Sequence, residues 1–290
     1  MASTRDLRRK IRSVKNTSQL TKAMKMVSAA KLRRAQEAML AARPYSQGLR
    51  HVLSEIGKRA KEELHPLLAS RPEKTVDLVV VAGDKGLCGA FNANVVKLAE
   101  KWRKEKEAAG VRVVVTVVGR KAAEFYRRRP QIEVRESLSD FFRGMNYIQV
   151  RDIAERLQAR FVAGETDAVY LCFNEFRTVA SQTTLVRPLL PLNATNDVRE
   201  HEATATEYVY EPDAESLLGI MLPRHVSFQL WQALLESTAS EHGARMAAMD
   251  SATRNANEVI AKLTLKMNRV RQAAITTEII EVVSGADALA

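Results

Sequence analysis

The sequence predicts two kinds of structure: an antiparallel two-helix coiled coil, formed by the N- and C-terminal segments, and an α/β domain between them. Heptad-like seams occupy both ends of the chain, and strand-like β-branched runs occupy its middle. Glycine and proline are scarce, at 12 and 8 of 290 residues, so turns are few and the helices should be long. We therefore expect an N-terminal coil helix over 1–59, an α/β domain over 60–208 and a C-terminal coil helix over 209–290.

Residues 3–59 are predicted to form one long helix. Ser3 and Asp6 have the spacing of a capping box, and Pro44 is expected to kink or interrupt the helix. Alternating steps of four and three give the following seam: Leu7, Ile11, Val14, Ser18, Thr21, Lys25, Ser28, Leu32, Ala35, Met39 and Ala42. Many seam residues are small, so a partner helix must approach closely.

Residues 213–284 predict a second helical stretch. Asp213 can cap its start, Pro223 is expected to divide it, and Gly285 is expected to stop it. Its seam is again spaced by four and three: Met246, Met249, Thr253, Ala256, Ile260, Leu263, Met267, Val270, Ala274 and Thr277. The remainder, Glu278–Ala290, has acidic, small and apolar residues but no basic ones, and is expected to emerge as a single helix.

The middle of the chain changes period. Three β-branched runs predict buried strands at Thr75–Ala82, Val111–Val118 and Asp167–Asn174. Helical stretches are expected at about Ala93–Ala109, Arg120–Arg129 and Tyr147–Ala163, and Thr178–Leu190 is expected to be an edge strand. This alternation predicts a small, mostly parallel, Rossmann-like sheet covered by helices.

The net charge of +11 is unevenly distributed. Residues 1–59 carry 15 basic and 3 acidic residues, whereas residues 209–290 carry 7 and 10. A basic helix can face nucleic acid, an anionic membrane surface or an acidic protein partner. Residues 1–44 contain no aromatic side chain, which argues against a module that stacks bases. No apolar run reaches the roughly 18 residues of a membrane span, and the N-terminus has no apolar signal core.

No catalytic pattern accompanies these elements. The loop Gly83–Gly89 follows a predicted strand, but its spacing fits neither dinucleotide-binding nor P-loop motifs, so a turn or protein-contact loop is expected. Cys88 is either a reactive thiol or, as we favour, a small residue tucked beneath that loop. Two cysteines 84 positions apart suit a reducing compartment, and the five histidines form no metal-spaced pair. We expect neither metal nor cofactor.

Four separated segments carry a resemblance to a known family. These are IRSVKNTSQLTKAMKMVSAAKLRRAQ (Ile11–Gln36), GLCGAFN (Gly86–Asn92), ASEHGARMAAMDSATRNA (Ala239–Ala256) and ITTEIIEVVSGADA (Ile275–Ala288). In this order they resemble stretches of the γ subunit of F-type ATP synthases, in its bacterial form. The resemblance implies a non-catalytic rotor shaft whose terminal helices turn inside the hexamer of α and β subunits. It also implies contacts with the ε subunit and the membrane c-ring, and a peripheral location at the cytoplasmic face of the bacterial inner membrane.

The same resemblance implies partner contacts at matching positions. On the coil these are Met24, Arg245, Arg271, Gln272 and Glu278, and in the loop they are Gly86, Leu87, Cys88 and Gly89, which the resemblance places near ε and the c-ring.

Two other functions stay open. A nucleic-acid binder would explain the basic helix but not the central sheet, and a nucleotide-dependent oxidoreductase would explain the sheet but lacks the fingerprint.

Overall fold

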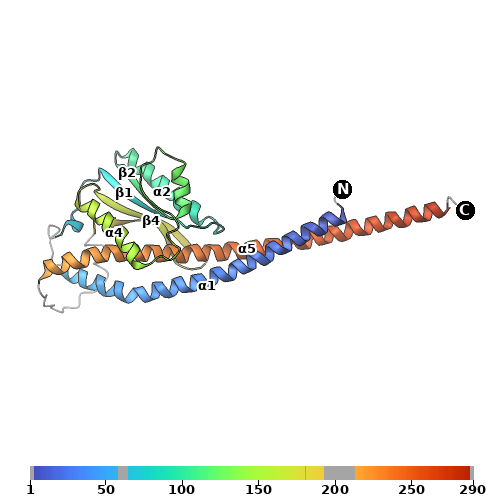
Figure 1. The fold of residues 1–290 in the computed structure, drawn as a ribbon, viewed down its shortest axis with the longest axis horizontal. Helices are drawn as coiled ribbons and strands as arrows, with labels where there is room; N and C mark the ends of the chain where they lie inside the picture. Colours follow the sequence, from blue (N-terminus) through green and yellow to red (C-terminus); the bar gives the residue numbers. More distant parts are fainter. Residues whose placement is uncertain (1–2, 58–64, 180, 193–212, 288–290) are drawn as a thin grey trace. The chain divides into compact units, whose positions relative to one another are not determined.

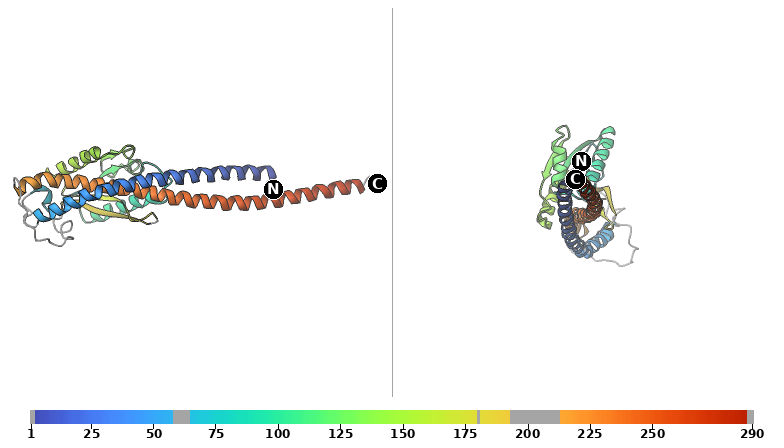
Figure 2. Two further views of the ribbon diagram at one scale, coloured as in Figure 1. Left: turned by 90° about the horizontal axis from the view of Figure 1, so that it is seen from below. Right: turned by 90° about the vertical axis from the view of Figure 1, so that its right-hand side faces the viewer.

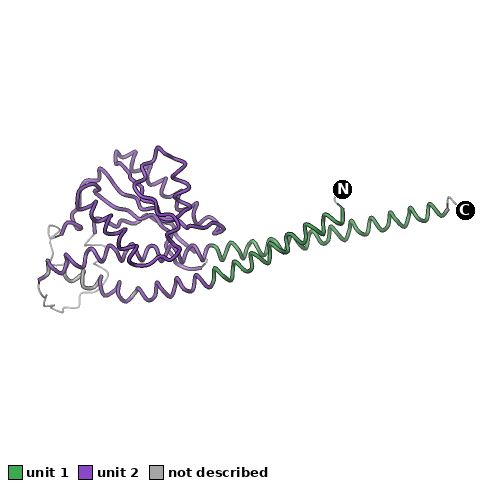
Figure 3. Tube along the Cα trace, in the orientation of Figure 1, with its two compact units in different colours: residues 1–29, 245–290 green, residues 30–244 purple. Residues whose placement is uncertain are grey.

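The computed structural model describes residues 3–57, 65–179, 181–192 and 213–287 (Figure 1). The expected domain boundaries at 59–60 and 208–209, and the last residues 288–290, lie outside these ranges. The chain forms two compact units, residues 1–29 with 245–290 (unit 1) and residues 30–244 (unit 2), shown in Figure 3. The predicted boundaries follow the ends of the helices, whereas the units divide both long helices.

Two long helices run through both units. Helix α1 spans Thr4–Gly57 and helix α5 spans Ala214–Asp287. The caps follow the prediction: the backbone N–H of Asp6 donates to Ser3 Oγ (3.2 Å), and that of Ser216 donates to Asp213 Oδ1 (2.8 Å). Each cap satisfies an N–H group that has no partner inside its own helix.

The central sheet has five strands in the order β3-β2-β1-β4-β5. Its strands are β1 (Thr75–Val81), β2 (Arg112–Val118), β3 (Val134–Leu138), β4 (Ala168–Phe176) and β5 (Gln182–Leu190). Neighbouring pairs from β3 to β4 are parallel, and β5 runs antiparallel to β4 at the edge. The mostly parallel sheet and the edge strand are therefore confirmed.

Helices cover both faces of the sheet. Helices α2 (Phe91–Ala108) and α3 (Arg120–Arg127) contribute to the core on one face, which includes Val95, Ala122 and Tyr126. Helix α4 (Tyr147–Val162) and the unit 2 part of α5 contribute to the core on the other face. A capping box between Asn146 and Gln149 begins α4. A short 3₁₀ helix, η2, spans Pro66–Leu68.

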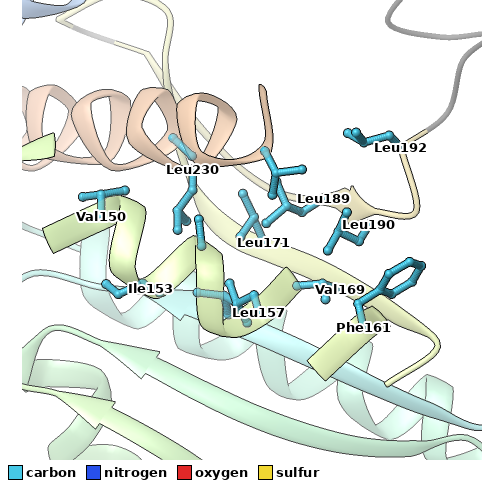
Figure 4. Packing of buried hydrophobic residues seen from close by; sticks show 14 of the residues in the cluster. Val150, Ile153, Leu157, Phe161, Val169, Leu171, Leu189, Leu190, Leu192 and Leu230 are labelled. Atoms are coloured by element: carbon cyan, nitrogen blue, oxygen red, sulfur yellow. The ribbon is translucent and has the colours of Figure 1, made fainter. Parts of the chain in front are cut away.

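Figure 4 shows the second core from close by. Four residues of α4 (Val150, Ile153, Leu157 and Phe161) point toward apolar residues of β4 and β5. Leu230 of α5 completes this layer, so α5 is as much a core element of unit 2 as α4 is. Burial of such side chains contributes about 1.5–3 kcal/mol each.

A carboxylate lies within this second core. Asp77 of β1 is fully buried, accepts a hydrogen bond from Thr116 Oγ1 (2.9 Å) and lies 3.6 Å from a guanidinium nitrogen of Arg160. Burial raises the pKa of Asp77, and the Arg160 charge opposes this rise. The pair joins α4 to β1 and thereby ties the helix to the sheet.

In unit 1, α1 and α5 lie side by side and antiparallel (Figure 2). Thr21 pairs with Thr253, and Lys25 pairs with Asp250, so paired residue numbers add to about 275. The first helical residue of α1, Thr4, is therefore level with about residue 271 of α5. Every described residue from Arg271 to Ala286 is exposed, which confirms that α5 continues as a single helix. The single helix begins earlier than predicted, and the last two predicted seam residues, Ala274 and Thr277, are exposed and do not face α1.

Both prolines lie inside continuous helices, so the division expected at Pro223 is wrong. At Pro44 the helix is not interrupted, and a kink there stays a prediction. A proline leaves the carbonyl four residues earlier without its helical hydrogen bond. Those carbonyls belong to Leu40 and Gly219, which are both exposed, so water can satisfy them. Gly285 does not stop α5 either, because the helix ends at Asp287.

Gly119, between β2 and α3, has a conformation that only glycine adopts easily. Its φ is +98°, and a Cβ there would lie 1.8 Å from the carbonyl oxygen of Ala82. We expect Gly119→Ala to lower the free energy of unfolding by at least about 2 kcal/mol, measured by urea denaturation of the full chain. Gly48→Ala is the matched control, because Gly48 lies inside α1 with open space around it. This control should raise stability by about 0.5–1 kcal/mol. Equal stability of the two variants would contradict this explanation.

Candidate functional site

The residues singled out from the sequence lie in both units, and all of them except the buried Arg245 and Cys88 are at least partly exposed. Met24, Arg245 and the stretch Arg271–Glu278 belong to unit 1, and the loop Gly86–Gly89 belongs to unit 2. Such surfaces suit contacts with other proteins, so the candidate functional site is a set of interaction surfaces on the coil, on the end of α5 and on the loop.

Polar side chains occupy the middle of the coil. Lys25 Nζ lies 2.6 Å from Asp250 Oδ1, and Arg254 lies 3.4 Å from the other oxygen of that carboxylate. Hydrogen bonding to Lys25 lowers the pKa of Asp250. Met24 is half-buried beside this ion pair, and Arg245 is buried. Any contact that Met24 makes with a partner would therefore lie next to a charged pair.

The outer face of α1 carries exposed apolar residues that sequence reasoning missed. Leu20, Met26 and Val27 are 62%, 60% and 57% exposed. They lie among exposed basic residues such as Lys15 and Lys22. Apolar side chains surrounded by one sign of charge are typical of protein interfaces rather than of a solvated helix face. Leu20 and Val27 are seven residues apart and lie outside the seam. This spacing is the signal in the sequence that could have predicted an exposed apolar surface on α1.

The end of α5 presents a second exposed apolar surface. Arg271, Gln272 and Glu278 are all exposed there, and α1 does not reach their level. Five large aliphatic side chains in this stretch are also exposed: Ile275, Ile279, Ile280, Val282 and Val283. A helix with apolar groups over this much of its circumference requires a covering partner.

The loop after β1 has Leu87 on its surface and Cys88 beneath it. Leu87 has a φ of +60° and is exposed, whereas the Cys88 side chain is only 1% exposed. The Asn92 amide holds the loop: its nitrogen donates to the carbonyl of Lys85 (3.1 Å) and to Cys88 Sγ (3.2 Å), and its oxygen accepts from the Gly83 N–H (2.8 Å). The interpretation of Cys88 as a small residue tucked beneath the loop is confirmed.

At the carboxyl end of β1, near which α/β proteins commonly bind nucleotides, the space is occupied by the chain's own polar groups. A Cβ on Gly83 would lie 2.7 Å from the carboxyl group of Glu241, and Ser240 Oγ donates to the carbonyl of Asn174 (3.1 Å). At the N-terminus of α3, the carboxylate of Asp84 accepts the backbone N–H of Arg120 (2.9 Å). Protein carboxylates thus lie where phosphate oxygens would bind.

The loop therefore begins beside Glu241, at the end of the unit 2 part of α5 that leads into residue 245. Its placement near ε and the c-ring stays a prediction.

Over the described residues, no three His, Cys, Asp or Glu side chains are grouped to hold a metal ion. Within the same ranges, no helix combines the length and apolar character that crossing a membrane requires.

Comparison with known proteins identifies the family. A family model described as ATP synthase matches residues 3–289. The ATP synthase gamma chain of Anaeromyxobacter sp. (strain Fw109-5) is 47% identical over the whole of both chains, and that of Geobacter metallireducens is 48% identical over all of this chain and 99% of the relative. The chain belongs to the ATP synthase gamma-chain family.

Solved structures share the fold of this gamma-chain family member. One chain from the central stalk and c-ring of Tetrahymena thermophila mitochondrial ATP synthase is 26% identical, with a TM-score of 0.57 over 80% of this chain and 99% of that chain. A chain from Euglena gracilis mitochondrial ATP synthase is 20% identical, with a TM-score of 0.68 over 99% of this chain and 94% of that chain. The resemblance drawn from four segments of the sequence is confirmed.

The Asn92 hydrogen bonds predict the reactivity of Cys88. We expect Asn92→Ala to loosen the loop and to raise the rate of Cys88 alkylation by about tenfold or more, measured by mass spectrometry of the labelled peptide. Asn94→Ala, at an exposed position two residues further along α2, is the control and should leave the rate unchanged. Cys172 should stay unlabelled throughout, because burial raises its pKa to about 12. Equal labelling of Cys88 in both variants would contradict a loop held by Asn92.

Proposed function

We propose that this chain is the central rotor shaft of a bacterial F-type ATP synthase. As such it couples proton flow through the membrane sector to ATP synthesis and hydrolysis on the β subunits. The coil of α1 and α5, with α5 continuing alone beyond α1, is the observation that carries this proposal. Such a helical end cannot be covered by the described part of the chain, and a surrounding hexamer of α and β subunits would cover it.

The coil surface supports contacts with the β subunits. Torque requires the shaft to bind the open and closed forms of each β subunit unequally, since a ligand with equal affinity for two states shifts neither. The exposed Leu20 and Val27, in a strongly basic helix, fit levers that combine apolar and acidic residues. Met24 and Arg245 are proposed to act in the same region, next to the Lys25–Asp250 ion pair.

The other proposed contacts lie at the end of α5 and in the loop of unit 2. Arg271, Gln272 and Glu278 are proposed to meet the upper part of the hexamer, and the aliphatic tip to turn in an apolar sleeve. The loop Gly86–Gly89, with Leu87 at its surface, is proposed to contact ε and the c-ring. Through this complex the chain would be peripheral at the cytoplasmic face of the inner membrane.

The proposal gives the chain no catalytic site of its own. Glu241 lies against Gly83 at the carboxyl end of β1, and Asp84 caps the N-terminus of α3, which favours a structural role for the α/β domain. The function as a whole is tested by purifying the tagged chain from its host. Co-purification with a complex that hydrolyses ATP is expected, and recovery without α and β subunits would contradict the proposal.

These two carboxylates predict the behaviour of the chain alone toward nucleotides. We expect calorimetry with Mg·ATP to give no stoichiometric binding to the isolated full chain, because its carboxylates repel phosphate where a nucleotide would bind. Lys85→Ala, in the loop, should behave in the same way. Binding with one ATP per chain, lost in Lys85→Ala, would show that the loop is a nucleotide site.

The end of α5 predicts unequal effects of two changes. Deletion of Ala286–Ala290 should lower assembly of the complex modestly while rotation-linked ATP hydrolysis survives, because a smooth sleeve needs little interlocking with the tip. Replacing Arg271 and Gln272 together by alanine should lower ATP turnover further than this truncation does, because polar contacts that change with rotor angle are lost. The measurement is ATP hydrolysis per assembled complex. Loss of hydrolysis in a fully assembled truncated complex would show that the tip drives rotation.

A further inference from the structure

The seam between α1 and α5 in unit 1 is interrupted by a block of polar side chains. The block consists of three hydrogen-bonded pairs: Ser18 Oγ with Asn257 Oδ1 (2.9 Å), Thr21 Oγ1 with Thr253 Oγ1 (2.7 Å) and Lys25 Nζ with Asp250 Oδ1 (2.6 Å). We call these six residues the polar block. Thr21 is the most enclosed of them on α1, at 8% exposed, and the ion pair is about 40% exposed on each side.

The polar block is compatible with one register of the two helices. The numbers of its paired residues add to 274 or 275 in every case. The same register brings the apolar seam residues Val14 and Ile260 level with each other, and likewise Leu7 and Met267. Apolar contacts alone do not distinguish this register from one shifted by a heptad, because a heptad shift brings one apolar position opposite another.

A heptad shift would leave the polar block without its partners. Thr21 would move from Thr253 to Met246 in one direction and to Ile260 in the other. Lys25 would lose Asp250 in both. In a shifted register the Thr21 hydroxyl, which is 8% exposed, would keep only its bond to the carbonyl of Ser18 in its own helix. The ammonium of Lys25, about 40% exposed, would lose its charged partner. Both losses are unfavourable, whereas apolar residues at the same positions would accept either register. The polar block therefore lowers the stability of the coil but favours one register over the shifted ones, as single polar seam residues do in other coiled coils.

We propose that the polar block is a register lock: Ser18, Thr21 and Lys25 of α1, paired with Asn257, Thr253 and Asp250 of α5, set the axial position of one helix against the other. They are positioning residues for energy coupling. That second part rests on the proposed rotor function, since a shaft whose two helices slide past each other would carry its partner contacts out of alignment.

Register is measured in the full chain by disulfide formation between pairs of cysteines outside the polar block. Val14→Cys with Ile260→Cys reports the observed register. Val14→Cys with Met267→Cys, and Leu7→Cys with Ile260→Cys, report the two shifted registers. The native Cys88 and Cys172 are buried and can stay in place. With the polar block intact we expect the two shifted reporters to cross-link at about one tenth of the yield of the first, or less.

The test variant makes two of the three pairs of the block apolar, with Thr21→Val, Lys25→Leu, Thr253→Val and Asp250→Leu. Apolar replacement of paired polar groups usually preserves or increases stability, so the coil should stay folded. We expect cross-linking of the shifted reporters to rise about tenfold. The matched control, Glu258→Leu with Lys262→Leu, removes two exposed charges outside the seam and should leave the register unchanged. The exchange Lys25→Asp with Asp250→Lys should retain the observed register.

The same variants in the assembled complex test the role in coupling. We expect the apolar variant to pump fewer protons per ATP hydrolysed, by about twofold or more, and the control and the exchange variant to pump normally. An apolar variant that cross-links only in the observed register would overturn the register lock. Shifted cross-links with normal coupling would overturn the positioning role and leave the rotor function intact. Absence of the unaltered chain from any ATP-hydrolysing complex would overturn the rotor function without changing the cross-linking result.

Discussion

The packing of α5 against the sheet is the interaction on which the rest of unit 2 depends. A mostly parallel sheet built from β-branched runs is apolar on both faces, and each face requires a helical cover. Helices α2 and α3 cover one face, but α4 alone provides only part of the cover on the other, and residues of α5 such as Leu222, Val226 and Leu230 supply the remainder. The same continuous helix then enters the coil of unit 1. Helix α5 is therefore both a core element of unit 2 and one of the two helices of the coil in unit 1.

The second constraint is that two helices of 54 and 74 residues cannot bury all of their surface in a chain of this size. In unit 1 they cover one another along a seam whose middle is polar, and beyond the start of α1 the surface of α5 is left exposed. Exposure of Ile279, Val282 and similar side chains is unfavourable in water, so the end of α5 requires another protein that covers these side chains. The family explains this surplus of exposed apolar and basic surface, because a central shaft is surrounded by other subunits.

Much of the fold and part of the candidate site could be predicted from the sequence. The two seams, the capping residues Ser3 and Asp213, four of the five strands and the enclosed position of Cys88 follow from local spacing and residue type, and the structure confirms them. The strand β3 was missed because its five residues, VRESL, are mostly polar, and it exists only because β2 offers it a parallel edge. The prolines misled the prediction of helix breaks because local propensity does not include the packing that keeps α1 and α5 continuous through them.

The sequence by itself determined the two long helices, four of the five strands, most of the residues that face a seam, the position of the basic charge and, through four separated segments, the family. These properties are local or periodic, so they can be read from spacing alone. The tertiary structure decided the register that pairs Lys25 with Asp250, the position of Glu241 at the carboxyl end of β1 and the burial of Asp77 beside Arg160. Each of these joins residues that are more than 80 positions apart. Such contacts depend on how whole elements pack, and no local pattern encodes the partner that a side chain meets after packing.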